Sequence, residues 1–167
     1  MNGAIRNKTL IMTLRERIDK WLERILVAVM SILVVDVLWQ VTSRYVLASP
    51  SSFTDELAGF LLIWVGLLGA AYVAGKNEHL AIDLLLQKSP PKRQRLIEIS
   101  INILVTVFAV TVMVAGGSWL VYTRFLFEVK SAALQIPLGY VYLVLPLSGL
   151  LITYFTIDNT AKLIKGQ

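Results

Sequence analysis

Residues 25–47 read ILVAVMSILVVDVLWQVTSRYVL, a nearly continuous apolar run interrupted by two charged side chains, Asp36 and Arg44. A helix needs about 20 predominantly apolar residues to cross the hydrocarbon core of a bilayer. The run is therefore predicted to be a membrane-spanning helix, and its length is typical of a helix that crosses the bilayer completely.

Three more stretches of similar character follow, at residues 57–75, 96–122 and 137–157. The hydrophobic fraction of the whole chain is 56% and the charged fraction is 16%, a composition typical of a membrane protein. We therefore expect an all-α integral membrane protein with four transmembrane helices, which form a single domain over residues 1–167.

The basic residues predict the orientation of these helices. Thirteen of the sixteen lie in the N-terminal flank, in the segment between the second and third spans, or in the C-terminal tail, and the other three are Arg44, Arg124 and Lys130. Because basic residues accumulate on the cytoplasmic side, both termini are predicted to be cytoplasmic, with loops 48–56 and 123–136 outside. The net charge of +5 is thus explained by membrane borders, and we expect no nucleic-acid partner.

Two shorter segments have helical periodicity but cannot span a bilayer. Residues 10–24 place apolar side chains at helical spacing and charged side chains between them. Residues 79–88 are apolar and are followed by Pro90 and Pro91. Both segments are predicted to be amphipathic helices lying in the headgroup region, in contact with membrane lipids.

Polar residues in the first span form a stripe on one side of the helix, consisting of Asp36, Gln40, Ser43 and Arg44. A carboxylate facing lipid at mid-membrane would cost roughly 2.5–3.5 kcal/mol, so Asp36 is expected to face protein or water, or to be protonated. Asp36 and Arg44 are about 12 Å apart along one helix and cannot pair directly. The stripe predicts contact with another helix, and a proton or ion relay is the alternative reading.

Small residues at every fourth position mark the second span, at Gly66, Ala70 and Ala74. Such ridges allow helices to approach closely in lipid, so these residues are further candidates for a partner interface, although small residues are also simply common in membrane helices. The chain has no cysteine and shows no pattern of a nucleophile with its base, a phosphate-binding loop or a zinc site. We expect no enzymatic activity, no cofactor and no metal.

Several short motifs, in order along residues 20–157, resemble the small membrane subunit of TRAP (tripartite ATP-independent periplasmic) transporters. The residues that carry the resemblance are Arg44-Tyr45, Phe53-Thr54-Asp55-Glu56-Leu57, Trp64, Gly69-Ala70-Ala71, Glu78-His79-Leu80-Ala81-Ile82-Asp83, Lys130-Ser131-Ala132-Ala133-Leu134, Ile136-Pro137, Tyr140, Tyr142, Pro146 and Gly149. Two departures concern the start of the second span, where the family usually has Trp before an acidic pair and this chain has Phe53, with Asp55 in place of the first Glu. A third concerns residues 76–78, which differ in order from the basic residue and Gly that often precede the His motif.

The resemblance implies a supporting role in the bacterial inner membrane. A large multispanning subunit would carry the substrate and sodium sites and move by an elevator mechanism, with this chain widening its static scaffold. A periplasmic binding protein would deliver a carboxylated solute, such as a C4-dicarboxylate or a sialic acid, and Arg124, Glu128 and Lys130 are the candidates here for docking it. The rival hypothesis is a stand-alone homodimeric exporter that uses Asp36 as its proton site.

Overall fold

The computed structural model describes residues 2–49, 51–76 and 91–165, and all of its long elements are helices. The helices are α1 (Asn2–Tyr45), α2 (Ser52–Lys76), α4 (Pro91–Phe108), the π-helix η1 (Ala109–Gly116), α5 (Gly117–Leu126), α6 (Leu138–Tyr142) and α7 (Val144–Lys165). Four helical stretches are long and apolar enough to cross a membrane: Arg15–Tyr45, Ser52–Lys76, Leu96–Leu126 and Leu138–Leu163. The predicted all-α membrane fold with four spanning helices is confirmed.

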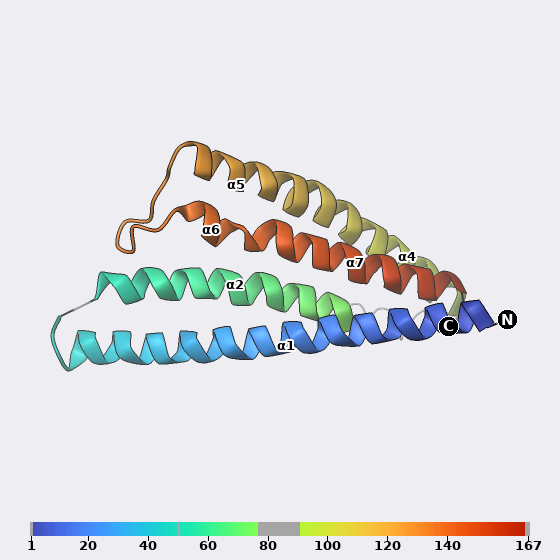
Figure 1. The fold of residues 1–167 in the computed structure, drawn as a ribbon, viewed down its shortest axis with the longest axis horizontal. Helices are drawn as coiled ribbons and strands as arrows, with labels where there is room; N and C mark the ends of the chain where they lie inside the picture. Colours follow the sequence, from blue (N-terminus) through green and yellow to red (C-terminus); the bar gives the residue numbers. More distant parts are fainter. Residues whose placement is uncertain (1, 50, 77–90, 166–167) are drawn as a thin grey trace.

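The helices are arranged as a row (Figure 1). Helix α1 packs on α2, α2 packs on α7, and α7 packs on α4 and η1. Both termini lie at one end of the row, and the loops after α1 and α5 lie at the other (Figure 1). This agrees with an even number of crossings, while the assignment of that end to the cytoplasm stays a prediction.

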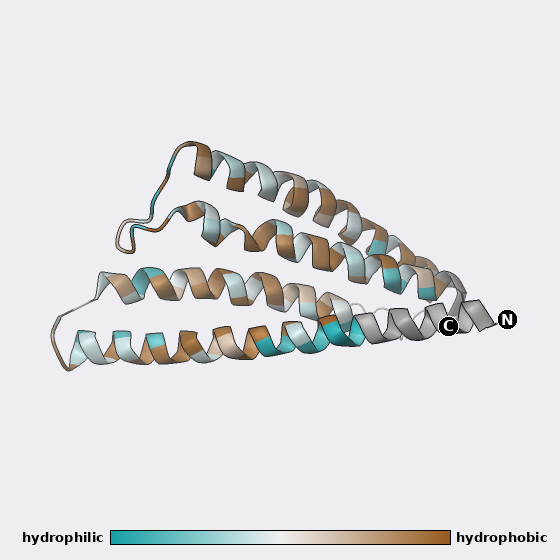
Figure 2. Cartoon of the chain, in the orientation of Figure 1, coloured by the Kyte–Doolittle hydropathy of each residue, from teal (hydrophilic) through white to brown (hydrophobic). Residues whose placement is uncertain are grey.

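A small core lies along the contacts between neighbouring helices of the row. It is formed by buried residues of α1, α2, η1 and α7: Leu22, Leu68, Ala71, Ala74, Ala109, Met113, Val144, Ile152 and Phe155. Phe155 fits because Gly75 has no side chain, since a Cβ there would lie 3.2 Å from the Phe155 ring. Most other apolar side chains in the described part of α1 are exposed. The second half of this helix, coloured mostly brown in Figure 2, is therefore available to lipid or to another protein.

The segment 10–24 is not a separate helix, because α1 runs without interruption from Asn2 to Tyr45. Part of its apolar side also packs inside the chain: Leu22 is buried, and Ile18 and Ile25 pack against the core. Trp21 on the same segment is exposed. The periodicity of this segment thus reflects, at least in part, contact with protein. The second predicted interfacial helix, residues 79–88, lies outside the described residues, as do His79 and the motif around it.

Two irregularities interrupt the third and fourth spans. The third contains the eight-residue π-helix η1 just before Gly117, a segment that the sequence did not reveal beyond its paired glycines. The fourth is divided at Leu143 into α6 and α7. Pro146 lacks the N–H that would bond to the carbonyl of Tyr142, and its ring crowds that carbonyl. The break at Leu143, one turn before the proline, follows from these two effects.

Cysteine labelling tests the orientation, because the chain has no cysteine of its own. We expect Ser52→Cys and Ala133→Cys to react in intact cells with an impermeant thiol reagent, and Ser89→Cys to react only after the cells are opened. Ala133 is exposed, whereas the neighbouring Ser131 is buried and would be a poor site. Labelling at Ser89 in intact cells would reverse the predicted topology.

Candidate functional site

The polar stripe on α1 is partly satisfied within the chain. Gln40 donates a hydrogen bond from its side-chain amide to the carboxylate of Asp55, at the start of α2. Ser43 is buried, and its hydroxyl donates to the Gln40 carbonyl at 2.9 Å. The stripe therefore helps to join α1 to α2.

Asp36 remains the exceptional member of the stripe. Its side chain is buried, with a relative exposure of 7%. Its Oδ2 atom accepts no hydrogen bond from any residue that the structure describes. Nearly all buried polar atoms in proteins have a hydrogen-bond partner. The Asp36 carboxylate is thus enclosed by the chain itself, and its Oδ2 atom has no donor among the described residues.

Arg44 lies one turn beyond Gln40 and is exposed. A small hollow of about 170 Å³ lies between α1 and the start of α2, and is lined by Gln40, Arg44, Ser51 and Asp55. No salt bridge to Arg44 is formed by the described residues. Its charge is thus available at the loop end of α1.

The small-residue ridge of α2 is divided between interior and surface. Ala74 is buried, and its carbonyl accepts a hydrogen bond from Asn159 of α7 at 3.2 Å. Gly66 and Ala70 are exposed, and a Cβ added at Gly66 would meet no atom within 4 Å. Only the Gly66 and Ala70 part of the ridge is therefore open to close approach by another helix.

The three docking candidates differ in their surroundings. Arg124 is half-buried, with its guanidinium carbon 5.8 Å from the centre of the Tyr142 ring. Glu128 and Lys130 are exposed on the loop between α5 and α6. Glu128 and Lys130 are accessible to a soluble partner, whereas Arg124 also helps to hold α5 against α6.

Glu56 fixes this loop to α2, a contact that the sequence did not suggest. Its carboxylate accepts hydrogen bonds from three consecutive backbone N–H groups, at 3.0 Å from Ala132 and 2.8 Å from both Ala133 and Leu134. The partners in these three hydrogen bonds lie 76 to 78 residues apart in the chain, which is why no local pattern reveals them.

The opposite end of the row is held by a second polar cluster. Arg15 of α1 forms an ion pair with Asp158 of α7 and donates to the carbonyl of Gly75 on α2. Lys162 also pairs with Asp158, at 2.6 Å. Arg15 and Asp158 each retain 17% of their side-chain exposure, so this cluster joins three helices in a partly desolvated setting.

The described residues contain no group of three or more His, Cys, Asp or Glu side chains that could hold a metal ion. Their polar contacts instead join helices and order a loop, and a large apolar surface is left exposed on α1. Fold and site together define a multi-pass membrane protein with an exposed apolar side on α1.

Comparison with known proteins shows the family to which this membrane protein belongs. Residues 32–166 match the family described as tripartite ATP-independent periplasmic transporters, DctQ component. The chain belongs to this family and is a small membrane subunit of a TRAP transporter, hence a transport protein and not an enzyme. The resemblance noted in the sequence is thereby confirmed.

Individual relatives agree. The chain is 28% identical, over 152 residues, to the sialic acid TRAP transporter small permease protein SiaQ of Vibrio cholerae, covering 91% of this chain and 86% of SiaQ. It is 34% identical over 92 residues to the sialic acid TRAP transporter permease protein SiaT of Haemophilus influenzae, covering 54% of this chain but only 14% of SiaT. It is also 27% identical over 101 residues to the isethionate TRAP transporter permease protein DctMQ of Oleidesulfovibrio alaskensis, 60% of this chain and 16% of DctMQ.

Proposed function

We propose that this small permease subunit acts as a static scaffold for a large elevator-type subunit, in the inner membrane, during sodium-coupled uptake of a carboxylated solute delivered by a periplasmic binding protein. The observation that carries the proposal is the exposed apolar side of α1, where Leu38 and Trp39 are 62% and 57% exposed. A second membrane protein packed on α1 would cover these side chains.

The relatives support a partnership of this kind. In SiaT and DctMQ, the segment similar to this chain makes up only 14% and 16% of a much longer permease protein. A sequence that occurs inside a long permease in some relatives and in a small permease protein such as SiaQ in others is expected to pack against the large permease in both cases. The partner is thus a large multispanning subunit, and the heteromer forms through the exposed side of α1.

Sialic acid is named for two of the relatives, which favours an organic acid as the solute. The exposed Glu128 and Lys130 are the groups proposed to contact the binding protein. Arg124 would help to position their loop through its contact with Tyr142. Because Glu56 ties the same loop to α2, the docking surface is ordered before any partner arrives.

Reconstitution into liposomes tests the proposal. We expect uptake of labelled sialic acid or C4-dicarboxylate, driven by an inward sodium gradient, only when this chain, its large permease partner and the binding protein are all present. The chain alone should give background flux with either a sodium or a proton gradient. Proton-driven flux by the chain alone would contradict the scaffold and support the rival exporter that uses Asp36.

A further inference from the structure

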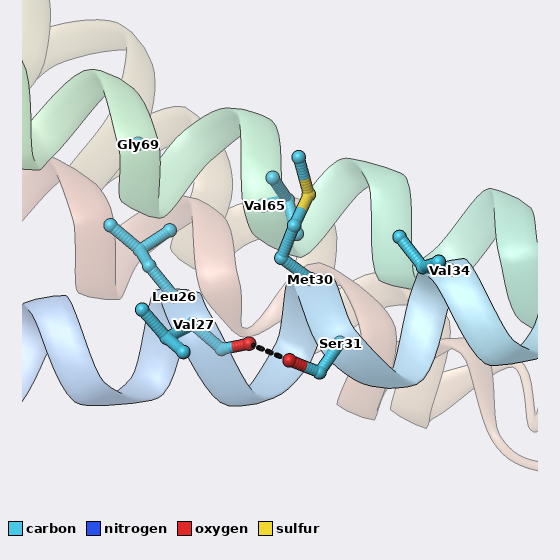
Figure 3. Close-up of a pocket in the computed structure, with 7 residues that line it drawn as sticks. All are labelled: Leu26, Val27, Met30, Ser31, Val34, Val65 and Gly69. Atoms are coloured by element: carbon cyan, nitrogen blue, oxygen red, sulfur yellow. Dashed lines mark hydrogen bonds between the residues drawn. The ribbon is translucent and has the colours of Figure 1, made fainter.

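A groove runs between α1 and α2 on the surface, away from the polar contacts described above. It has a volume of about 610 Å³ and is lined by Leu26, Val27, Met30, Ser31, Val34, Val65 and Gly69 (Figure 3). The Ser31 hydroxyl donates to the Val27 carbonyl of its own helix at 2.7 Å. With that group satisfied, the groove offers an apolar wall along its length.

The groove has room because of Gly69. A Cβ at this position would meet no atom within 4 Å, so the floor of the groove on α2 is open. On the α1 side, Val27, Met30 and Val34 are each at least half exposed, at 63%, 50% and 51%. The described chain therefore leaves this surface uncovered, and it fits a long, thin apolar group.

A second hollow adjoins the first and is of opposite character. It has a volume of about 430 Å³, is lined by Lys20, Glu23, Arg24, Val27 and Ala28, and shares Val27 with the apolar groove. Lys20 and Arg24 are exposed. One end of the groove is thus lined by two basic side chains, Lys20 and Arg24, and one acidic side chain, Glu23.

The change from basic to apolar side chains follows one face of α1. Arg17, Lys20, Arg24, Val27, Ser31 and Val34 alternate spacings of three and four residues, so they follow a single face of the helix. Three cations are followed by apolar or small residues, and α1 correspondingly changes from teal to brown in Figure 2. From Arg24 to Val34 the helix rises about 15 Å, half the roughly 30 Å hydrocarbon thickness of a bilayer.

We propose that this composite groove is a binding site for one anionic phospholipid, with the phosphate near Lys20 and Arg24 and an acyl chain between α1 and α2 as far as Val34 and Gly69. Charge complementarity favours a lipid over a partner helix, because a row of three cations ends where the apolar wall begins. The distance of about 15 Å from Arg24 to Val34 matches the thickness of one leaflet, which favours an acyl chain as the apolar part of the ligand. The site follows α1 from Lys20 to Val34 and ends just before Asp36.

The full-length chain, delipidated and returned to nanodiscs of phosphatidylcholine with a minor fraction of phosphatidylglycerol, tests the proposal. Lipid retained on release from the discs is counted by native mass spectrometry. We expect preferential retention of one phosphatidylglycerol. The variant Lys20→Gln/Arg24→Gln should lose this preference roughly tenfold, because each basic residue near the membrane surface adds to the electrostatic attraction for an anionic lipid. Gly69→Leu, which fills the groove, should lower retention of either lipid.

Matched controls separate this site from general charge and packing effects. Lys76→Gln/Arg93→Gln removes the same charge elsewhere, and Gly59→Leu fills another position with no atom within 4 Å; both should retain the lipid as the unchanged chain does. Equal retention by all variants would overturn the site. It would also be overturned if no lipid were retained and Gly69→Leu instead released a co-purifying membrane protein, because the groove would then hold a partner helix.

Discussion

Replacing Leu38 by asparagine is expected to reduce co-purification of this subunit with the large permease by roughly tenfold. Leu38 is 62% exposed on α1, and the asparagine amide would be left without a hydrogen-bond partner in the proposed contact. This costs about 1–3 kcal/mol, and 1.4 kcal/mol corresponds to a tenfold change in affinity. The measurement is pull-down from mild detergent extracts, followed by sodium-driven uptake in liposomes.

Three comparisons make the Leu38 result specific. Leu38→Met keeps an apolar side chain of similar volume and should retain most of the complex. Leu104→Asn makes the same change at an exposed position of α4 and should behave as the unchanged chain. The isolated Leu38→Asn subunit should unfold at the same temperature as the original, because Leu38 is exposed in the chain alone. A lower unfolding temperature for the isolated chain would mean that Leu38 is needed for the internal fold and does not serve a partner.

Replacing Arg15 by alanine should lower the free energy of unfolding of the subunit by about 1–3 kcal/mol, because breaking a partly buried ion pair leaves a carboxylate with less compensation. Asp158 would keep only Lys162, and the carbonyl of Gly75 would lose its donor. The guanidinium contact with the Phe155 ring, 5.8 Å to its centre, would be lost as well. Denaturant unfolding in detergent micelles, followed by tryptophan fluorescence, measures the change.

The exposed Arg17 supplies the control for this cluster. Arg17→Ala removes the same charge two residues away and should change stability by about 0.5 kcal/mol or less. Combining Arg15→Ala with Asp158→Asn should cost less than the sum of the two single changes, since the residues share one interaction. Equal losses for Arg15→Ala and Arg17→Ala would show that the ion pair does not hold the three helices together.

The four spans were predictable because the bilayer demands about 20 apolar residues in sequence, and that demand is local. The break before Pro146 was predictable for the same reason, since a proline acts on the preceding turn. The contacts of Glu56, Gln40 and Arg15 were not, because each joins residues brought together only by the fold. The apolar face of residues 10–24 shows the limit clearly: periodicity reveals that Leu22 must be covered, but whether lipid or protein covers it depends on where α2 and α7 lie.

The row of helices has a mechanical consequence. A row one helix deep gives a small chain a broad outline in the membrane plane, at the expense of a thick core. When a neighbouring transport domain slides through the bilayer, the remainder of the assembly must resist being pushed sideways or tilted. A broad plate displaces more lipid for each degree of tilt than a compact bundle of equal mass, so viscous and elastic resistance from the bilayer would help to keep the proposed scaffold still while its partner moves.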